Sequence, residues 1–467
     1  MALTKDERKA RKARRAKTPA APAHGEAKPL AAEPGTEPDG EALAALHLDD
    51  IDGWDLRQKG EWLTFTANMP GYDRPRQFRR LIAPLEAKEI SHVIADAPGP
   101  LLGILTLGGA RSAKTLRLPP AFPCHILTSA DGIGPAGLSG TAEATALSHL
   151  HRVHAMTQET LLAEAYLQAR AAETKSLPLI FVRNESDGSA DIAELAEGMA
   201  FRNLMIAARN LRDAAARLGK EARLLCVRLN YGLEDVRSDE TAFRAGMVRL
   251  LDKLTAGLLA LGFDRPVFLA NFDCGIADQS DHPAMRTYGT LAWSHGLHDF
   301  ILPQPAYGLA HDSYGRLTPD AMRQLAGIEL AALTQVRPQN WWFCPMGLLA
   351  EASDATIRVR FRAMGDLEID AADPFQAGEA AGFTLDNAQG VEIAGVSLSP
   401  DDPQDVLIRL NRAPKPGLRL RYGIGAAPAP GQTTPPARGA LREKMVLRLA
   451  DGAPYFRWAL PFVLDVH

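Results

Sequence analysis

Cysteine is scarce in this sequence. The 467 residues contain four cysteines, which lie far apart and form no CxxC pair: Cys124, Cys226, Cys274 and Cys344. A disulfide framework and a cysteine-based zinc site are therefore not expected, and a reducing compartment is the simpler interpretation. We expect neither a metal nor another cofactor.

Long apolar runs are also missing. No stretch of 18 or more apolar residues occurs, so the sequence predicts no insertion into a membrane. The first residues are charged and rich in alanine, without the apolar segment of a signal peptide. We therefore expect synthesis in the cytoplasm.

A strong net charge of either sign is absent as well. The formal net charge is −4 over the whole chain, which excludes a nucleic-acid binder that works through a global basic field. Hydrophobic residues make up 46% and charged residues 23% of the chain. These fractions are close to the globular norm and predict a sizeable core. The length predicts about two to three domains.

Residues 1–42 form a predicted disordered tail. The first 17 residues carry eight Lys or Arg against Asp6 and Glu7, and a stretch rich in Pro, Ala, Gly and Glu follows. Such a stretch has little to bury and is typical of a flexible tether. The basic part is either a solubilising tail or an arm that docks on an acidic partner surface or on nucleic acid. The sequence does not choose between the two.

Residues 43–350 are predicted to form an α/β domain with a doubly wound parallel sheet. Apolar runs typical of buried strands alternate here with long segments of helical spacing. The strands are expected at 176–183, 222–232 and 265–275, and the helices at 190–219, 240–262 and 318–335. Such alternation predicts a parallel sheet with helices on both faces. Thr318 and Pro319 are the expected N-cap and first residue of the last helix.

Residues 351–467 are predicted to form a small β domain. Short segments with alternating polarity are separated by turns from about Ser353 onward. This arrangement is typical of a β-sandwich.

The order of four segments resembles the SGNH (GDSL-type) hydrolase superfamily, and within it the esterase-like proteins of bacterial prophages and related particles. The similarity spans roughly Leu81 to the C-terminus. Three of the segments are PLIFVRNESDGSADIAELAEG, CVRLNYGLEDVRSDETAFRAGM and YGLAHDSYGRLTPDAMRQLAGI. The fourth comprises ARGALREK and PYFRWALPFVLDVH near the end of the chain.

The resemblance implies acyl transfer at the carboxyl ends of the parallel strands. In this family a serine follows the first core strand in a G-D-S or G-Q-S block. A histidine removes its proton, and an aspartate three residues earlier in a D-x-x-H block orients the imidazole. Backbone N–H groups, including that of a loop glycine, stabilise the oxyanion together with an asparagine-type side chain.

The catalytic blocks are eroded in this chain. The place expected for the serine, in HVIADAPGPLLGI, reads Ala95-Asp96-Ala97-Pro98, and no serine follows before Ser112. Arg316 stands where the histidine precedes Leu-Thr, and an arginine stays protonated near neutral pH. We therefore expect a pseudoenzyme.

Several residues are candidates for a remaining site. The candidate catalytic residues are Ser129, Ser139, His311 and Asp312. The candidate binding residues are Gly188, Asn230, Glu234, Asp235 and Arg316.

Two histidines and three tryptophans have alternative interpretations. His151 and His154 lie three apart on a predicted helix, where a solvated face is favoured over a metal site. Trp293, Trp341 and Trp342 are either packing residues between domains or a stacking platform for sugar rings.

The favoured hypothesis is a carbohydrate-binding or structural component of a phage-like particle, such as a spike, fibre or adaptor that contacts the host envelope. The expected partners are a cell-surface glycan and, through the N-terminal arm, other particle subunits; the chain is expected to be a homo-oligomer and virion-associated. An alternative is an active carbohydrate O-acetylesterase with a rearranged Ser/His/Asp site. A third is a purely architectural subunit. The particle context rests on family analogy.

Overall fold

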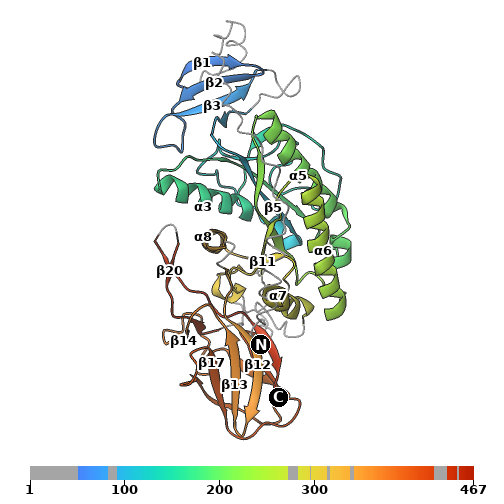
Figure 1. Ribbon diagram of the computed structural model, residues 1–467, viewed down its shortest axis with the longest axis vertical. Helices are drawn as coiled ribbons and strands as arrows, with labels where there is room; N and C mark the ends of the chain where they lie inside the picture. The colour runs from blue at the N-terminus through green and yellow to red at the C-terminus, as the bar shows by residue number, and fades with distance from the viewer. Residues whose placement is uncertain are drawn as a thin grey trace, which may run out of the picture.

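The computed structural model describes residues 51–82, 92–271, 282–294, 296–312, 316–336, 341–424, 439–449 and 452–467. The predicted tail, residues 1–42, lies outside the described residues. Three parts follow one another along the long axis in Figure 1: an N-terminal antiparallel sheet, a central α/β part and a group of C-terminal antiparallel sheets.

The central part contains a seven-stranded sheet with the order β11-β10-β9-β5-β8-β6-β7. All neighbours are parallel except β7, which pairs antiparallel with β6. Its strands are β5 (Leu101–Gly108), β6 (Ile126–Ser129), β7 (Leu150–Arg152), β8 (Leu179–Ser186), β9 (Ala222–Asn230), β10 (Val267–Ala270) and β11 (Asp299–Ile301). The α/β class predicted from the alternating segments is confirmed.

Helices cover both faces of this sheet, as the apolar character of its strands requires. In Figure 1, α3 (Gln158–Ala172) and α8 (Pro319–Gln335) lie on one side of β5, and α5 (Met199–Arg217) and α6 (Glu240–Ala260) lie on the other. Two buried apolar clusters are separated by the sheet, one against each pair of helices. The other helices in the described ranges are α4 (Ile192–Leu195), α7 (Pro283–Ser294), η1 (Ala110–Ala113) and η2 (Ala306–Gly308).

Glycine and threonine residues mark the ends of α5 and α6 and the start of α8, as the sequence predicts. Gly219 and Gly262 follow α5 and α6 with φ of +66° and +88°, a region that favours glycine. The Thr318 hydroxyl accepts from the backbone N–H of Ala321 at 3.3 Å and caps α8. The segment predicted as one helix over 190–219 is instead two helices, because the chain is extended at Gly198 between α4 and α5.

The first parallel strand is β5, which corrects the prediction that HVIADA begins the core sheet. Only Ile94–Ala95 of that segment is a strand, β4, and it pairs antiparallel with β3. It completes an N-terminal sheet of β1 (Gly53–Lys59), β2 (Trp62–Ala67), β3 (Arg76–Leu81) and β4. The apolar runs of the two sheets follow each other closely, so the sequence does not separate them.

The histidine-containing segment is a strand and not the predicted helix. His151 lies in β7 and pairs with Thr128 of β6. His154 follows the end of that strand. The spacing of three residues therefore does not place the two side chains on successive turns of a helix.

The C-terminal part consists of antiparallel sheets, as the alternating polarity predicts. One sheet has β12 (Met346–Ser353), β13 (Thr356–Arg362), β17 (Asp405–Leu410) and β16 (Ile393–Leu398). The others pair β14 (Leu367–Ile369) with β19 (Leu441–Glu443), β15 (Phe383–Asp386) with β18 (Arg419–Tyr422) and β22 (Phe462–Asp465), and β20 (Leu447–Arg448) with β21 (Pro454–Tyr455). One buried cluster includes Ile357 of the first sheet and Leu420 of β18. The predicted sandwich arrangement stays a prediction.

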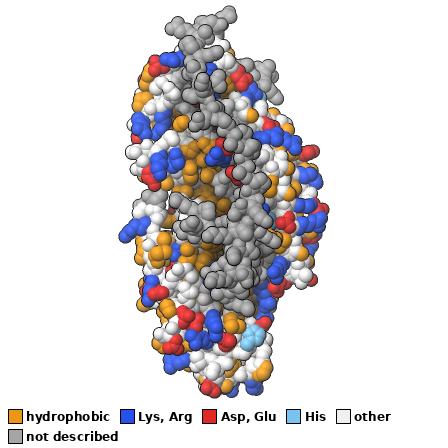
Figure 2. All heavy atoms as spheres, viewed as in Figure 1, with side chains coloured by type: hydrophobic (Ala, Val, Ile, Leu, Met, Phe, Trp, Pro, Cys, Tyr) orange, Lys and Arg blue, Asp and Glu red, His pale blue; other side chains and the backbone are white. Residues whose placement is uncertain are grey.

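The surface carries mixed charge. On the face drawn in Figure 2, Lys and Arg side chains are interspersed with Asp and Glu side chains, in line with the small net charge. None of the helices in the described ranges is long and apolar enough to cross a bilayer.

Candidate functional site

Three central strands end level with one another. Gly108 of β5 pairs with Ser186 of β8 and with Asn230 of β9. The loops that follow these strands therefore meet at the carboxyl edge of the sheet, where parallel α/β sheets bind their ligands.

The SGNH resemblance would put Ala110 in the place of the serine once β5 is taken as the first core strand. The strand ends at Gly108, so the G-x-S block falls on Gly108-Gly109-Ala110. The earlier placement at Ala95–Pro98 is wrong, because β4 belongs to the other sheet. The inference drawn from it is unchanged, because a methyl group cannot attack a carbonyl carbon.

Gly188, the predicted loop glycine, lies directly against Ala110. A Cβ on Gly188 would come within 2.8 Å of the Ala110 Cβ, which is closer than two such atoms can approach. The turn before it is held by Asp187, whose backbone N–H donates to the Gly108 carbonyl at 2.9 Å. The Asp187 carboxylate accepts from the backbone N–H of Ser189 at 3.0 Å.

Ser112 is the nearest serine after Ala110 in the chain, and its hydroxyl is already engaged. It lies buried in η1 and donates to the Gly109 carbonyl at 2.8 Å. The Asn184 side chain holds it from the other side, with Nδ2 donating to the Ser112 carbonyl at 2.6 Å. The Ser112 proton is thus directed to a backbone oxygen and not to a base.

The two candidate serines lie on the β6 side of the sheet. Ser129 ends β6, is buried, and accepts from Asn210 Nδ2 at 3.0 Å. Ser139 is exposed in the following loop with φ of +51°. Within the described ranges, neither hydroxyl is hydrogen-bonded to an imidazole.

The closing block brings Asp312 and Arg316 together, but without an imidazole between them. Asp312 Oδ1 accepts from the Arg316 backbone N–H at 3.0 Å. Lys114 Nζ donates to Asp312 Oδ2 at 2.9 Å and to the Leu317 carbonyl at 2.5 Å. The Asp312 carboxylate is therefore paired with a lysine.

His311 lies beside this pair and is kept neutral. Burial, with Arg111 and Lys114 nearby, lowers the pKa of its imidazole to about 4. Both ring nitrogens are buried, and neither has a hydrogen-bond partner of ordinary geometry among the described residues. The Leu309 backbone is close to the ring. A group with so low a pKa is a weak general base at neutral pH.

Hydroxyl–imidazole pairs do occur, but at the opposite edge of the sheet. Tyr72 is bonded to His125 at 2.8 Å and Thr255 to His298 at 3.2 Å. The two histidines precede the first residues of β6 and β11, so both pairs lie at the amino ends of the strands.

The loop after β9 carries the two predicted acidic binding residues. Asp235 is buried and accepts three backbone N–H bonds, from Ile192 at 2.9 Å, Arg237 at 3.1 Å and Ser238 at 2.9 Å. Glu234 Oε2 accepts from the Gly232 N–H at 3.2 Å, and its side chain packs against Gly109. Asp235 therefore holds the loop in shape, and Glu234 faces the Ala110 turn.

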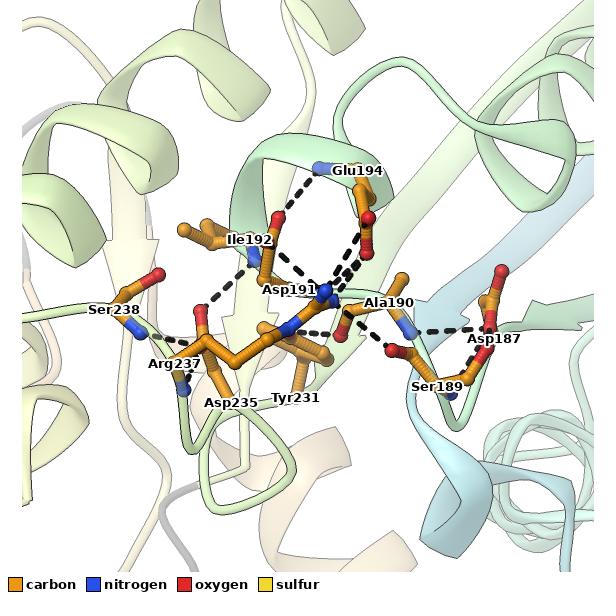
Figure 3. A network of polar contacts seen from close by, with 10 residues as sticks. All are labelled: Asp187, Ser189, Ala190, Asp191, Ile192, Glu194, Tyr231, Asp235, Arg237 and Ser238. Atoms are coloured by element: carbon orange, nitrogen blue, oxygen red, sulfur yellow. Dashed lines mark hydrogen bonds and ion pairs between the residues drawn. The ribbon is translucent and has the colours of Figure 1, made fainter.

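Ion pairs join the loop after β9 to the segment that follows β8. Figure 3 shows Arg237 reaching Glu194 and Asp191, and Tyr231 reaching the Ala190 carbonyl. The Tyr231 hydroxyl donates to Ala190 at 2.7 Å. The two loops are thereby fixed on each other, with Gly188 held near Ala110.

A small hollow opens among the η1 segment, the last residue of β9, the start of α3 and the segment that leads into α8. It has about 30 Å³ of water-accessible space, which admits one or two water-sized groups but not a sugar ring. Its lining residues are Arg111, Ser112, Lys114, Gln158, Asn230, Asn271, His311, Arg316, Leu317 and Met322. Ser112, His311, Asn230 and Arg316 are thus brought to one place, whereas Ser129 and Ser139 do not line the hollow.

A buried ionic cluster lies close to the hollow. Arg228 bonds to Glu329 at 2.7 Å and lies 3.8 Å from Glu159, with all three side chains at most 1% exposed. Asn271, which lines the hollow, is 3.4 Å from Arg228 Nη2. Sequence reasoning missed this cluster, because charged residues within an apolar strand and two helices give no local sign that they meet.

The tryptophan alternatives are settled for one residue. Trp342 is buried, stacks on Tyr455 with centroids 6.2 Å apart, and donates from Nε1 to the Pro303 carbonyl at 3.1 Å. It is therefore a packing residue. The side chain of Trp293 lies outside the described residues. No group of three or more His, Cys, Asp or Glu side chains suited to a metal occurs in the ranges that the structure covers.

Comparisons with known proteins give structural likenesses only. No family model matches the chain, and no curated protein matches it in sequence. It is similar to a carbohydrate acetylesterase from Xanthomonas citri, at 14% identity over 88% of this chain and 86% of that one, with a TM-score of 0.47. An Arabidopsis thaliana protein matches at 17% identity over 50% of this chain and 98% of that one, with a TM-score of 0.35.

A third likeness is to a carbohydrate esterase described as having divergent catalytic and non-catalytic binding functions in its active site. It is 11% identical over 62% of this chain and 96% of that one, with a TM-score of 0.26. All three TM-scores lie below 0.5, so we draw no functional argument from them.

Proposed function

We propose that this chain is a non-catalytic protein of the SGNH type that binds carbohydrate at the carboxyl edge of its parallel sheet. The observation that carries the proposal is the pair of replaced groups at that edge. Ala110 stands where the nucleophile belongs, and Lys114 holds the Asp312 carboxylate that would orient a base. In well-studied hydrolases the loss of triad members costs about 10⁴- to 10⁶-fold in rate.

The rest of the edge retains features suited to binding. The loop contacts described above hold the Gly188 turn against Ala110, and the Asn230 amide lines the hollow. A polar hollow of about 30 Å³ can take one hydroxyl group of a ligand that the protein does not cleave.

The proposal is tested by ester hydrolysis and glycan binding together. We expect the full-length protein to turn over an acetylated chromogenic ester no faster than buffer does, and to bind at least one glycan on an array. Turnover that disappears in Ser112→Ala, Ser129→Ala, Ser139→Ala or His311→Ala would contradict it. Arg212→Ala, an exposed residue on α5, is the matched control.

The second candidate is an active carbohydrate O-acetylesterase with a rearranged site. One observation favours it: Ser112 and His311 line the same hollow, and Asp312 follows His311. It requires Ser112 to give up its bond to the Gly109 carbonyl and turn to the imidazole. Loss of turnover in both Ser112→Ala and His311→Ala, but not in Ser129→Ala, would support this candidate.

The particle context is proposed separately. A basic arm of eight Lys or Arg on a Pro/Ala-rich tether is suited to anchoring the chain in a larger assembly as a spike, fibre or adaptor. Co-purification of the full chain with phage-like particles, lost when residues 1–42 are deleted, is the expected result. A chain found only free in the cytoplasm would contradict it, and incorporation without any glycan binding would favour the purely architectural role.

A further inference from the structure

The hollow at the carboxyl edge carries several basic side chains. Three of its lining side chains are cations, Arg111, Lys114 and Arg316. Asp312, which lies beside it, is paired with Lys114. Arg316 is exposed and forms no ion pair with the residues that the structure describes. A ligand that brought negative charge to Arg316 would therefore gain a charge-assisted bond.

Two buried acceptors in the lining of the hollow have no donor among the residues whose placement is described. Asn230 and Gln158 are 9% and 5% exposed, and their side-chain carbonyl oxygens have no partner in the described part of the chain. The orientation of Gln158 is fixed, because its Nε2 donates to the Met322 carbonyl at 2.9 Å. Buried acceptors of this kind are normally satisfied, and a hydroxyl group would supply the missing donor.

We propose that the ligand of this site is an acidic sugar, an inference that rests on the carbohydrate-binding function proposed above. A sugar hydroxyl enters the hollow and donates to Asn230 or Gln158, and the carboxylate stays at the mouth against Arg316. The volume of about 30 Å³ suits a single hydroxyl and leaves the ring outside. A neutral sugar would satisfy the inner wall but leave the exposed cation without a partner.

The test compares trigalacturonic acid with its fully methyl-esterified form, by calorimetry on the full-length protein at low salt. We expect the acid to bind at least about tenfold more tightly than the ester. Arg316→Gln should weaken binding of the acid by about tenfold and leave the ester unchanged. Arg323→Gln, an exposed arginine on α8 paired with Asp320, should change neither.

A second variant probes the inner wall. Asn230→Asp keeps the shape of the side chain and adds a negative charge, so binding of the acid should fall more than binding of the ester. Equal affinity for the two forms, with Arg316→Gln inert, would overturn the inference while leaving the carbohydrate-binding function standing. Failure to bind either form, together with a blank glycan array, would overturn both.

Discussion

Single residues decide what the carboxyl edge can do. A serine hydroxyl attacks an ester only if a neighbouring base takes its proton, and the proposed function is that this chain lacks both the serine and an oriented base. Ala110 presents a methyl group, and Lys114 neutralises the carboxylate that would steady an imidazole. Because both changes block the same proton transfer, restoring one of them leaves the step blocked.

The contact between Gly188 and Ala110 makes a prediction at this scale. Gly188→Ala places a methyl group 2.8 Å from the Ala110 Cβ, so the loop must shift, and we expect a loss of about 1–3 kcal/mol in the free energy of unfolding. Ala110→Gly removes the clash. The double variant should therefore lose less than the sum of the two single variants, measured by urea unfolding. Strict additivity would contradict the contact.

The buried cluster around Arg228 makes a second prediction. Arg228→Met leaves Glu329 and Glu159 buried without their cation, so the free energy of unfolding should fall by about 3–5 kcal/mol at pH 8. Burial already raises the pKa of both carboxyl groups, and protonation relieves the unpaired charge. The deficit should therefore shrink as the pH falls to 5.

Arg212 supplies the control for that experiment. It is exposed and paired with Asp213 on the surface of α5, where an ion pair contributes about 0–1 kcal/mol. Arg212→Met should therefore leave the urea midpoint nearly unchanged at both pH values. An equal effect of the two arginine variants would contradict the account of the cluster.

Elements differ in how well the sequence predicts them. β8 and β9 were predictable from continuous apolar runs. α6 and α8 were predictable because helical apolar spacing is bounded by Gly262 after α6 and by Thr318 before α8. β5 was missed, because GPLLGILTLGG follows an equally apolar segment that belongs to another sheet. That error moved the expected nucleophile block, which the resemblance would put on Ala110 when it is counted from the end of β5.

The residues of the candidate site could likewise be predicted only in part from the sequence. The sequence predicts Gly188, Asn230 and Arg316 from motif order, and the structure brings Asn230 and Arg316 to one hollow. Lys114 and Gln158 could not be predicted, because they reach that hollow from separate segments, after η1 and at the start of α3. Their roles depend on tertiary contacts that leave no local pattern.

The junction of β7 with the N-terminal sheet predicts acid sensitivity. His92 Nδ1 accepts from the Arg152 backbone N–H at 3.0 Å, and the ring stacks on His151 with centroids 4.2 Å apart. Burial, His151 and Arg152 lower the pKa of His92 to about 3. The unfolded chain takes up this proton from about pH 6.5 downward, and the folded chain does not. Stability is therefore lost as the pH falls from that value towards 3.

His92→Asn isolates this contribution. Asparagine keeps an acceptor for Arg152 but does not titrate, so the fall in Tm between pH 7 and pH 4.5 should be smaller in the variant than in the unsubstituted chain. His467→Asn, at an exposed position, should leave the fall unchanged. An identical fall in all three proteins would contradict a role for His92.

At the scale of the whole molecule, the central and C-terminal parts share a buried polar junction. The Tyr307 hydroxyl, in η2, donates to the Ala459 carbonyl at 2.7 Å and lies 3.3 Å from that of Tyr422. Tyr455 donates to the Pro303 carbonyl at 3.2 Å. Bonds of this kind across a buried surface favour unfolding as one unit.

Calorimetry tests that junction. We expect a single unfolding transition for the full chain, and Tyr307→Phe should lower its free energy of unfolding by about 1–3 kcal/mol, because the Ala459 carbonyl loses its donor. Tyr166→Phe, on the half-exposed face of α3, should have little effect. Two well-separated transitions, with only one of them sensitive to Tyr307→Phe, would contradict the coupling.

The most direct test of the central claim is covalent labelling with a fluorophosphonate, which reacts with activated serines. The account predicts no adduct on the full-length protein after exposure that labels an active serine esterase completely, as read by intact-mass and peptide mass spectrometry. A stoichiometric adduct on Ser112, lost in His311→Ala, would show a working nucleophile and base and would contradict the account.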